Sequence, residues 1–355
     1  MRYLNSVSFF LGANTPDGFY SLFNELYNPY SDWKMFIIKG GPGTGKSTIM
    51  KAIANKAEEK SLFSELIYCS SDPSSLDGVI IPEIKVAIAD GTSPHTIEPI
   101  FPGICEHIVN LGDFWNINKL NNDKAKIKMI SMTNSAAHKN CVKYMKAARL
   151  LENEIGKYTD SIIDKNKINR FASRFLCIEQ NDSSDFVTKN RFISALSPVG
   201  IKIMNDTVNY YCDDITIIKD NYNIAHYITD AIANASVDKK LNMIVCRCSM
   251  NPLKKIDHII FPDLRKGIFT SNQYHEIKGN HTISSLRFID RNILNKNKNS
   301  ISFINKAKKE MINESINSLK SAKSAHDILE SYYIDSMDFD KVNNEKDLLL
   351  KTIFD

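Results

Sequence analysis

Short apolar runs separated by amphipathic stretches mark the first half of the chain. The runs "MFII" at 35–38, "LIYC" at 66–69 and "VAIA" at 86–89 each have the length of one buried parallel strand. Between the first two runs, Ile49 and Ala57 lie on the same side of a predicted helix that begins near residue 46. Strands that alternate with helices in this way are typical of α/β folds.

Two longer stretches, 118–169 and 301–350, have a helical pattern throughout. Each half of the chain is therefore expected to carry a long helical arm. Such an arm could serve as a lid, a contact in a homo-oligomer or a rod that binds a partner. The simpler expectation is that the two arms pack on each other and on the sheets.

The second half of the chain repeats the first. "FFLGANTPDGF" from Phe9 resembles "RFISALSPVGI" from Arg191, and "YCSSDPSSLDGVIIPEI" from Tyr68 resembles "RCSMNPLKKIDHIIFPDL" from Arg247. The repeated segments keep their order at an offset of roughly 174 to 182 residues. We therefore predict a tandem duplication with its seam near 179–190 and two domains.

The first strand runs directly into a complete phosphate-loop motif. "GGPGTGKS" fits G-x-x-x-x-G-K-[ST], in which glycines turn backbone N–H groups towards phosphates. Lys46 is expected to reach the β- and γ-phosphates, Ser47 to ligate Mg²⁺, and the following helix to point its positive end at the anion. The nucleotide-binding residues are predicted to be Gly40, Gly41, Pro42, Gly43, Thr44, Gly45, Lys46, Ser47 and Thr48.

This motif and the duplication together predict the fold class. We expect two tandem P-loop NTPase-like α/β domains, residues 1–185 and 186–355. Each domain is expected to have three layers, a mostly parallel sheet and a long helical extension.

The second copy of the loop, "DNYNIAHY" at 220–227, has lost the glycines, the lysine and the serine. His226 stands where the first half has Lys46, and a neutral imidazole cannot replace a fixed ammonium. We expect the second half to bind nucleotide poorly or not at all. The segment 220–227 is expected to form an ordinary strand-to-helix turn.

A phosphate loop also needs an acid that holds Mg²⁺ through water, normally at the end of a buried strand. Asp90 follows the run at 86–89, and its counterpart in the second half is Thr270. Asp72 is matched by Asn251. Acids lost together with the loop are expected to have served nucleotide and metal, so we assign Asp90 to Mg²⁺ and Asp72 to positioning water or substrate.

Two other candidates survive in both halves. Asp77 and His95 have counterparts in Asp257 and His275. Because the second half keeps them without a phosphate loop, we expect them to serve the fold, with the aspartates capping a turn.

Composition adds limits rather than new sites. The 355 residues carry a net charge of +4 without a basic block, so nucleic acid is not indicated. No apolar run approaches the ~20 residues of a membrane span, and the start lacks a signal-peptide layout, so we expect a cytoplasmic protein. Cys246 and Cys248 would point to opposite faces of a strand, so a cysteine metal site is not expected.

The motifs "FFLGANTPDGFYS", "IIKGGPGTGKST", "CSSDPSSLDGVIIPE" and "VAIADGTSPH" resemble those of a family of bacterial cytoplasmic ATP-binding proteins of about this length. The resemblance is specific in the first half and weaker in the second. It implies a tandem P-loop fold and ATP binding. Where both halves of such proteins carry a phosphate loop, this chain departs from the pattern, so a two-site mechanism is not expected here.

The sequence thus favours an Mg²⁺-dependent ATPase with one working site. Asp90 is followed by Gly91 rather than by a water-activating glutamate, so turnover is expected to be slow. Arg247 or Arg265 of the second half could reach across as an arginine finger. A P-loop kinase that holds its acceptor near 69–78, or a nucleotide-gated module that binds an unknown partner, remain alternatives.

Overall fold

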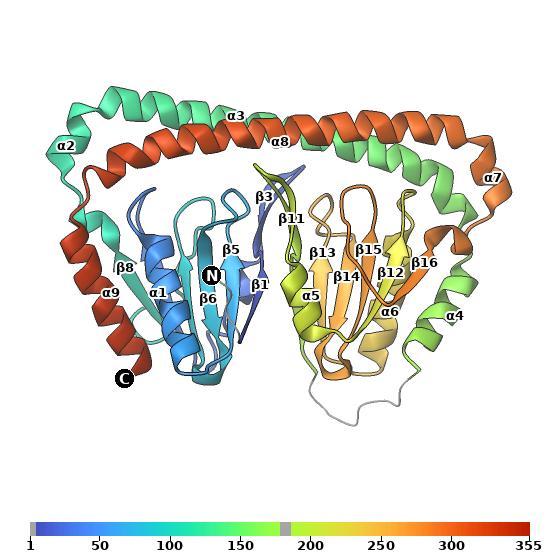
Figure 1. Ribbon diagram of the computed structural model, residues 1–355, viewed down its shortest axis with the longest axis horizontal. Helices are drawn as coiled ribbons and strands as arrows, with labels where there is room; N and C mark the ends of the chain where they lie inside the picture. Colours follow the sequence, from blue (N-terminus) through green and yellow to red (C-terminus); the bar gives the residue numbers. More distant parts are fainter. Residues whose placement is uncertain (1–4, 178–185) are drawn as a thin grey trace.

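The computed structural model describes residues 5–177 and 186–355. It contains two six-stranded sheets that stand side by side (Figure 1). The first has the order β1 (Ser6–Phe9), β5 (Ser64–Tyr68), β6 (Leu76–Ile81), β7 (Val86–Asp90), β4 (Lys34–Lys39) and β8 (Glu106–Asn110). The second has the order β9 (Thr188–Arg191), β13 (Met243–Arg247), β14 (Ile256–Phe261), β15 (Lys266–Ser271), β12 (Asp214–Lys219) and β16 (His281–Ser284).

Within each sheet one strand runs against its neighbours, β6 in the first and β14 in the second, while the other pairings are parallel. The predicted α/β class, with mostly parallel sheets in two repeated domains, is confirmed. The expected seam at 179–190 falls largely on residues 178–185, which lie outside the described ranges, and the proposed domain boundary falls at their end.

Each sheet has an outer face covered by helices and an inner face turned towards the other half. The outer helices are α1 (Lys46–Glu59) and α9 (Phe339–Phe354) on the first sheet, and α4 (Lys165–Phe175) and α6 (Ala225–Asp238) on the second (Figure 1). The inner faces share one hydrophobic core, to which Ile37 contributes from β4 and Ile217 from β12. That core is completed by the hairpins β2 (Gly12–Thr15)–β3 (Gly18–Ser21) and β10 (Ser194–Ser197)–β11 (Gly200–Ile203), and by α5 (Asn205–Tyr211).

The two helical arms cross from one half to the other. Their helices are α2 (Ile117–Asn122) and α3 (Lys124–Thr159) in the first half, and α7 (Arg291–Lys296) and α8 (Lys298–Ile334) in the second. After β8, α3 runs across to the second sheet, and the helix that follows it, α4, packs there on α6 (Figure 1). In the opposite direction, α8 runs back to the first sheet, where α9 packs on α1. The arms pack on each other along their length, which confirms the simpler expectation, but each half donates its last helix to the other half.

Backbone pairing follows an approximate two-fold axis. Phe10 and Phe192 exchange hydrogen bonds of 2.8 and 2.9 Å, and two bridges, Trp115–Met337 and Ile163–Ile289, tie the arm ends together. The halves correspond at a constant offset within each region: α2 and α7 differ by 174 residues (291 − 117), and β4 and β12 by 180 (214 − 34). Neither α3 nor α8, nor any other helix within the described residues, is both long and apolar enough to cross a membrane.

One buried ion pair joins the halves without following this symmetry. Arg191 on β9 donates to Glu65 on β5 at 2.9 and 3.2 Å, and their side chains are 2% and 1% exposed. Lys189 also contacts Glu65, at 2.6 Å. Burial opposes ionisation, but the two cations outweigh it and lower the pKa of Glu65 to about 2.

The variant Glu65→Gln tests this junction. It should lower the free energy of unfolding by about 3–5 kcal/mol, because it leaves the buried Arg191 guanidinium with only its 3.5 Å contact to Glu25 as a countercharge. Urea unfolding followed by circular dichroism measures the loss. As a control, Asp213→Asn breaks the exposed pair of Asp213 with Arg265 and should leave the urea midpoint near that of the unmodified protein. Equal losses in the two variants would contradict this account.

Candidate nucleotide site and its second-half counterpart

The phosphate-loop motif connects β4 to α1, as the sequence predicts. Residues 40–45 form the loop, and Lys46, Ser47 and Thr48 begin the helix. Gly43 and Gly45 have φ angles of 69° and 90°, in the left-handed region that favours glycine.

The structure brings Lys46 and Asp90 together. Parallel pairing of β4 with β7 sets Ile38 opposite Asp90, so the carboxylate lies level with the start of the loop. Lys46 Nζ lies 3.5 Å from Asp90 Oδ2 and donates to the carbonyl oxygens of Gly40 and Gly41 at 2.8 and 2.6 Å. Thr92 donates to the other oxygen of Asp90 through its N–H and its hydroxyl.

The donor set at this point suits magnesium. Ser47 Oγ accepts a hydrogen bond of 3.0 Å from the Leu76 N–H, which orients the hydroxyl. The serine hydroxyl and the carboxylate of Asp90 are hard oxygen ligands, of the kind that Mg²⁺ prefers.

Asp72 has different neighbours. Its carboxylate accepts hydrogen bonds from the hydroxyls of Ser74 and Ser75 and lies 3.5 Å from Lys323 Nζ on α8. Burial raises the pKa of Asp72, but the Ser74 bonds and Lys323 outweigh it and lower the pKa below its usual value. The contacts of Asp72 are thus with its own loop and with α8, whereas those of Lys46 are with Asp90 and the loop glycines.

The arm from the second half packs on the outside of the phosphate loop. A Cβ atom added to Gly43 would lie 2.8 Å from Ile334 Cγ1 and 2.9 Å from the carbonyl oxygen of Glu330, both on α8. Gly41 similarly packs on the Trp115 ring, and Gly45 on Val342 of α9. Glycine is therefore required here for close packing as well as for backbone conformation.

The arginine finger stays a prediction, and in this structure both candidate arginines have other partners. Arg247 donates to Asn190 at 2.8 Å, and Arg265 pairs with Asp213, so both arginines have partners within the second half. The cation that the second half places beside the first-half loops is Lys323. Its pairing with Asp72 joins residues far apart in the chain, which no local sequence signal reveals.

The second-half loop is not the ordinary turn that the sequence suggested. Asp220, at the end of β12, accepts hydrogen bonds from the N–H groups of Tyr222, Ile224 and Ala225 at 2.9, 2.7 and 2.7 Å. The hydroxyl of Ser285 adds a fourth at 2.9 Å. A carboxylate of the chain itself therefore occupies the anion position at the start of α6. The sequence signal for this internal acceptor is an aspartate at the position of Gly40.

The backbone of this loop keeps one feature of the first. Asn223 has φ 60°, at the position where Gly43 has φ 69°. The helix above has changed to match: Gly156 of α3 lies against Asn223, where Glu330 of α8 lies against Gly43. The contact is preserved, with glycine on the loop in one half and on the helix in the other.

Asp77 and His95 form a buried pair in the first half. His95 Nε2 lies 3.1 Å from Asp77 Oδ2, so Asp77 does not cap a turn as expected but pairs with His95 from within β6. Burial lowers the pKa of His95, but Asp77 outweighs it and raises the pKa above its usual value. Cys69 lies close by, and ligand atoms of the three side chains fall within 4.8 Å of one another, a set that could hold a metal.

The corresponding histidine in the second half has a different hydrogen-bond partner, although its ligand atom stays within 4.8 Å of that of Asp257. His275 Nε2 lies 2.6 Å from the hydroxyl of Ser194, which replaces Gly12 of the first half, so the imidazole has a different partner from His95. Burial raises the pKa of Asp257 to about 7 and lowers that of His275 to about 4. Burial thus favours the uncharged forms of Asp257 and His275, whereas Asp77 favours the protonated form of His95.

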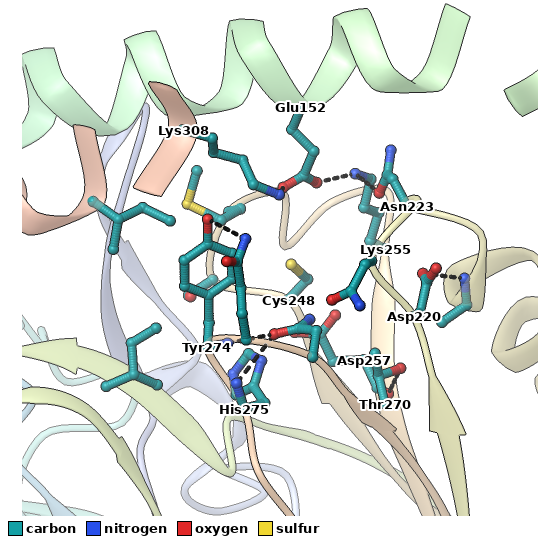
Figure 2. Close-up of a pocket in the computed structure, with 18 of the residues that line it drawn as sticks. Glu152, Asp220, Asn223, Cys248, Lys255, Asp257, Thr270, Tyr274, His275 and Lys308 are labelled. Carbon is teal, nitrogen blue, oxygen red and sulfur yellow. Dashed lines mark hydrogen bonds and ion pairs between the residues drawn. The ribbon is translucent and has the colours of Figure 1, made fainter. Parts of the chain in front are cut away.

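A pocket of about 90 Å³ adjoins this second-half pair and the loop at 220–227 (Figure 2). Its upper side is formed by Glu152 from α3 and Lys308 from α8, together with Lys255. No sequence pattern singles out these residues, because one glutamate and two lysines read as ordinary surface charges.

The variant Asp257→Asn tests the uncharged state. A carboxyl whose pKa rises from 3.8 to about 7 on folding stabilises the fold below pH ~4, and this contribution is lost as the pH rises to 7. An asparagine does not titrate, so the variant avoids that loss. The change in the free energy of unfolding caused by the substitution should therefore be about 3 kcal/mol more favourable at pH 8 than at pH 4. Urea unfolding at the two pH values measures the difference.

Asp77→Asn is the matched control and should act with the opposite sign. It takes the countercharge from His95, so it should destabilise the protein at pH 6, below the raised pKa of the imidazole. If Asp77→Asn and Asp257→Asn change the free energy of unfolding with the same sign and the same pH dependence, the two pairs do not differ in charge.

Comparisons of the chain with protein-family models, with curated proteins and with solved structures found no significant match. The function is therefore argued from the geometry of these sites.

Proposed function

We propose that the protein binds ATP with Mg²⁺ at the first-half loop and hydrolyses it slowly. The observation that carries the proposal is the carboxylate of Asp220, which marks the anion position of the related second-half loop. The first half has Gly40 at that place, which supplies no carboxylate, so the anion there comes from a bound ligand.

The second half also indicates which amides bind the phosphates. Ile224 and Ala225 donate to Asp220 and correspond to Thr44 and Gly45 in the first half. These N–H groups, at the positive end of α1, would hold the β- and γ-phosphates. Lys46 would exchange its glycine carbonyls for phosphate oxygens.

Charge neutralisation completes the site. Ser47 and, through water, Asp90 would hold Mg²⁺, which offsets the negative charge that spreads over the phosphates during transfer. In this proposal Lys46 and Asp90 are catalytic residues. Asp72 is the acid that would position the attacking water or a phosphoryl acceptor.

Steric contacts support slow turnover. A Cβ atom on Gly91 would lie 2.3 Å from Ile37 Cγ2, so a water-activating glutamate cannot stand directly after Asp90 without rearrangement. Asp72 is held by Ser74 and Ser75, and Lys323 beside it brings a positive charge from the second half. A glutamate after Asp90 and an arginine finger are two groups that commonly accelerate hydrolysis. Because the described residues place neither at this site, we expect turnover to be slow.

The contacts on the outside of the loop favour a second function, a nucleotide-gated binding module. Ile334 of α8 and Val342 of α9 touch the loop glycines, so the loop and the arm cannot move independently. Tight ATP binding with negligible phosphate release would favour this module over the ATPase. Phosphorylation of a metabolite above the rate of hydrolysis would instead identify a kinase.

The variant Lys46→Ala tests the central assignment. It should weaken ATP binding in the presence of Mg²⁺ by about 10- to 100-fold, because it removes charge-assisted hydrogen bonds to phosphate. Asp90→Asn should mainly reduce phosphate release and the dependence on Mg²⁺. Calorimetry measures binding, and release of inorganic phosphate measures turnover.

His226→Ala is the matched control for Lys46→Ala, because the two residues occupy equivalent positions. Burial and the nearby Lys255 lower the pKa of His226 to about 4, so its loss removes no charge at pH 7. ATP binding should be unchanged. Unchanged binding in Lys46→Ala as well would refute the proposed nucleotide site.

The variant Gly40→Asp tests whether the second half shows how such a loop is inactivated. The new carboxylate should accept hydrogen bonds from the amides of Thr44 and Gly45, as Asp220 does from those of Ile224 and Ala225. ATP binding should be abolished, while the thermal unfolding midpoint should stay the same or rise. Gly40→Ala is the control for volume, since its Cβ would meet Thr44 Oγ1 at 2.7 Å without adding charge. If the Gly40→Asp variant still binds ATP, the assignment of the anion position is wrong.

A further inference from the structure

The second-half pocket lies between the loop at 220–227 and the paired arms (Figure 2). A water molecule needs about 10–15 Å³ of such space, so a volume of about 90 Å³ accommodates several waters or a small molecule. One wall is polar, and the other is apolar. The apolar wall consists of Met145, Leu196, Ile201, Met250 and Ile312.

The upper side of the pocket carries an excess of positive charge. Glu152 contacts Lys255 closely and lies 3.5 Å from Lys308 Nζ. Burial opposes ionisation of Glu152, but the two lysines lower its pKa to about 2, so it is a carboxylate. Two ammonium groups therefore face one carboxylate.

Lys308 is the less satisfied of the two cations. Lys255 also donates to Asn223 at 2.7 Å. Among the described residues, Lys308 makes one hydrogen bond, the 3.5 Å contact with Glu152, and its Nζ lies 5.2 Å from the centroid of the Tyr274 ring. An ammonium has three donors, so Lys308 has hydrogen-bonding capacity left for a ligand.

The rest of the lining adds one carboxylate, Asp220, whose charge is partly offset by the positive end of α6. Asp257 is largely protonated below pH 7, and His275 and His226 are neutral because their pKa values are about 4. The carboxylate of Asp220 is already held by its four donors at the start of α6. His275 Nδ1 is buried and has no hydrogen-bond partner in the described part of the chain, which is unusual for a polar atom that lines a pocket.

The three charged groups are peculiar to this half. At the offset of 174 residues between the arms, Glu152 and Lys308 correspond to His326 and Asn134 of the other half, and Lys255 precedes β14 where Ser75 precedes β6. Burying such a cluster is often no more stabilising than apolar packing of the same volume. The cluster is better explained by a ligand than by stability.

We propose that this pocket binds a small organic carboxylate with an apolar body. Lys308, supported by Lys255, receives the carboxylate, and the apolar body lies on the wall that contains Leu196 and Ile312. The site is separate from the first-half loop and does not depend on ATP binding there.

Other ligand classes fit the pocket less well. A cation would meet the ammonium groups of Lys308 and Lys255, while both carboxylates already have donors. Inorganic phosphate would find the amides of Ile224 and Ala225 already bound to Asp220. An uncharged apolar molecule would cover Lys308 without providing the acceptor that its ammonium requires.

Calorimetry on the full chain tests the proposal with benzoate and hexanoate as probes, compared with benzyl alcohol, hexan-1-ol and inorganic phosphate. One carboxylate per chain should bind. Affinity should fall at least about 10-fold in Lys308→Met, which removes a charge-assisted hydrogen bond. Lys309→Met, on the exposed neighbour, is the matched control and should bind as the unmodified protein does.

A second variant avoids the charged cluster. Ile201→Trp fills the pocket from the half-buried β11 and should abolish binding even if Lys308→Met fails to fold. Lys46→Ala should retain carboxylate binding, which separates this result from the fate of the nucleotide site. Each of four results would overturn the proposal: no binding of either carboxylate, equal affinity for the alcohols, competition by phosphate, or unaltered binding in Ile201→Trp.

Discussion

The antiparallel packing of α3 on α8 is the constraint on which the rest of the structure depends. Because each arm crosses to the other half before its last helix docks, α9 covers α1 and α4 covers α6. Neither half has a complete outer layer without the other. Each loop at a helix start is also covered from the opposite half, by Glu330 and Ile334 over Gly43 and by Gly156 beside Asn223.

This exchange connects the two sites physically. Lys308 near the start of α8 contacts the second-half pocket, and Ile334 at its end touches the phosphate loop. The 26 residues between them span about 39 Å of continuous helix. A displacement of α8 at either end therefore reaches the other end through one element, which gives the nucleotide-gated alternative its structural basis.

Single residue differences give the two halves different chemistry at corresponding positions. Asp220 in place of Gly40 supplies the loop with its own anion, and Ser194 in place of Gly12 gives His275 a partner other than the aspartate. In both cases a glycine of the first half corresponds to a polar side chain of the second. The second-half loop therefore contains its own acceptor, and the neighbouring pocket has three charged groups that the first half lacks at the corresponding positions.

Much of the fold followed from the sequence, because strand runs, the phosphate-loop motif and the repeat are local or periodic signals. They predicted β4, α1 and the repeated sheets, and the end of the run at 86–89 placed Asp90 level with the loop. The exchange of α9 and α4 could not be predicted, because helical periodicity shows which face is apolar but not which sheet it covers. Glu152, Lys255 and Lys308 meet only through that exchange, so their cluster was equally hidden.

The missed role of Asp220 shows what a decayed motif does and does not reveal. Loss of the glycines, lysine and serine indicates a changed site, but it leaves the left-handed conformation at Asn223, where the first half has Gly43. Backbone amides at a helix start need an acceptor whether or not a nucleotide is bound. In the first half Lys46 bonds the carbonyl oxygens of Gly40 and Gly41, so a bound phosphate must compete with these contacts for the ammonium. The second half meets the need of its amides with Asp220, an internal acceptor that holds its loop without the lysine and serine of the first half.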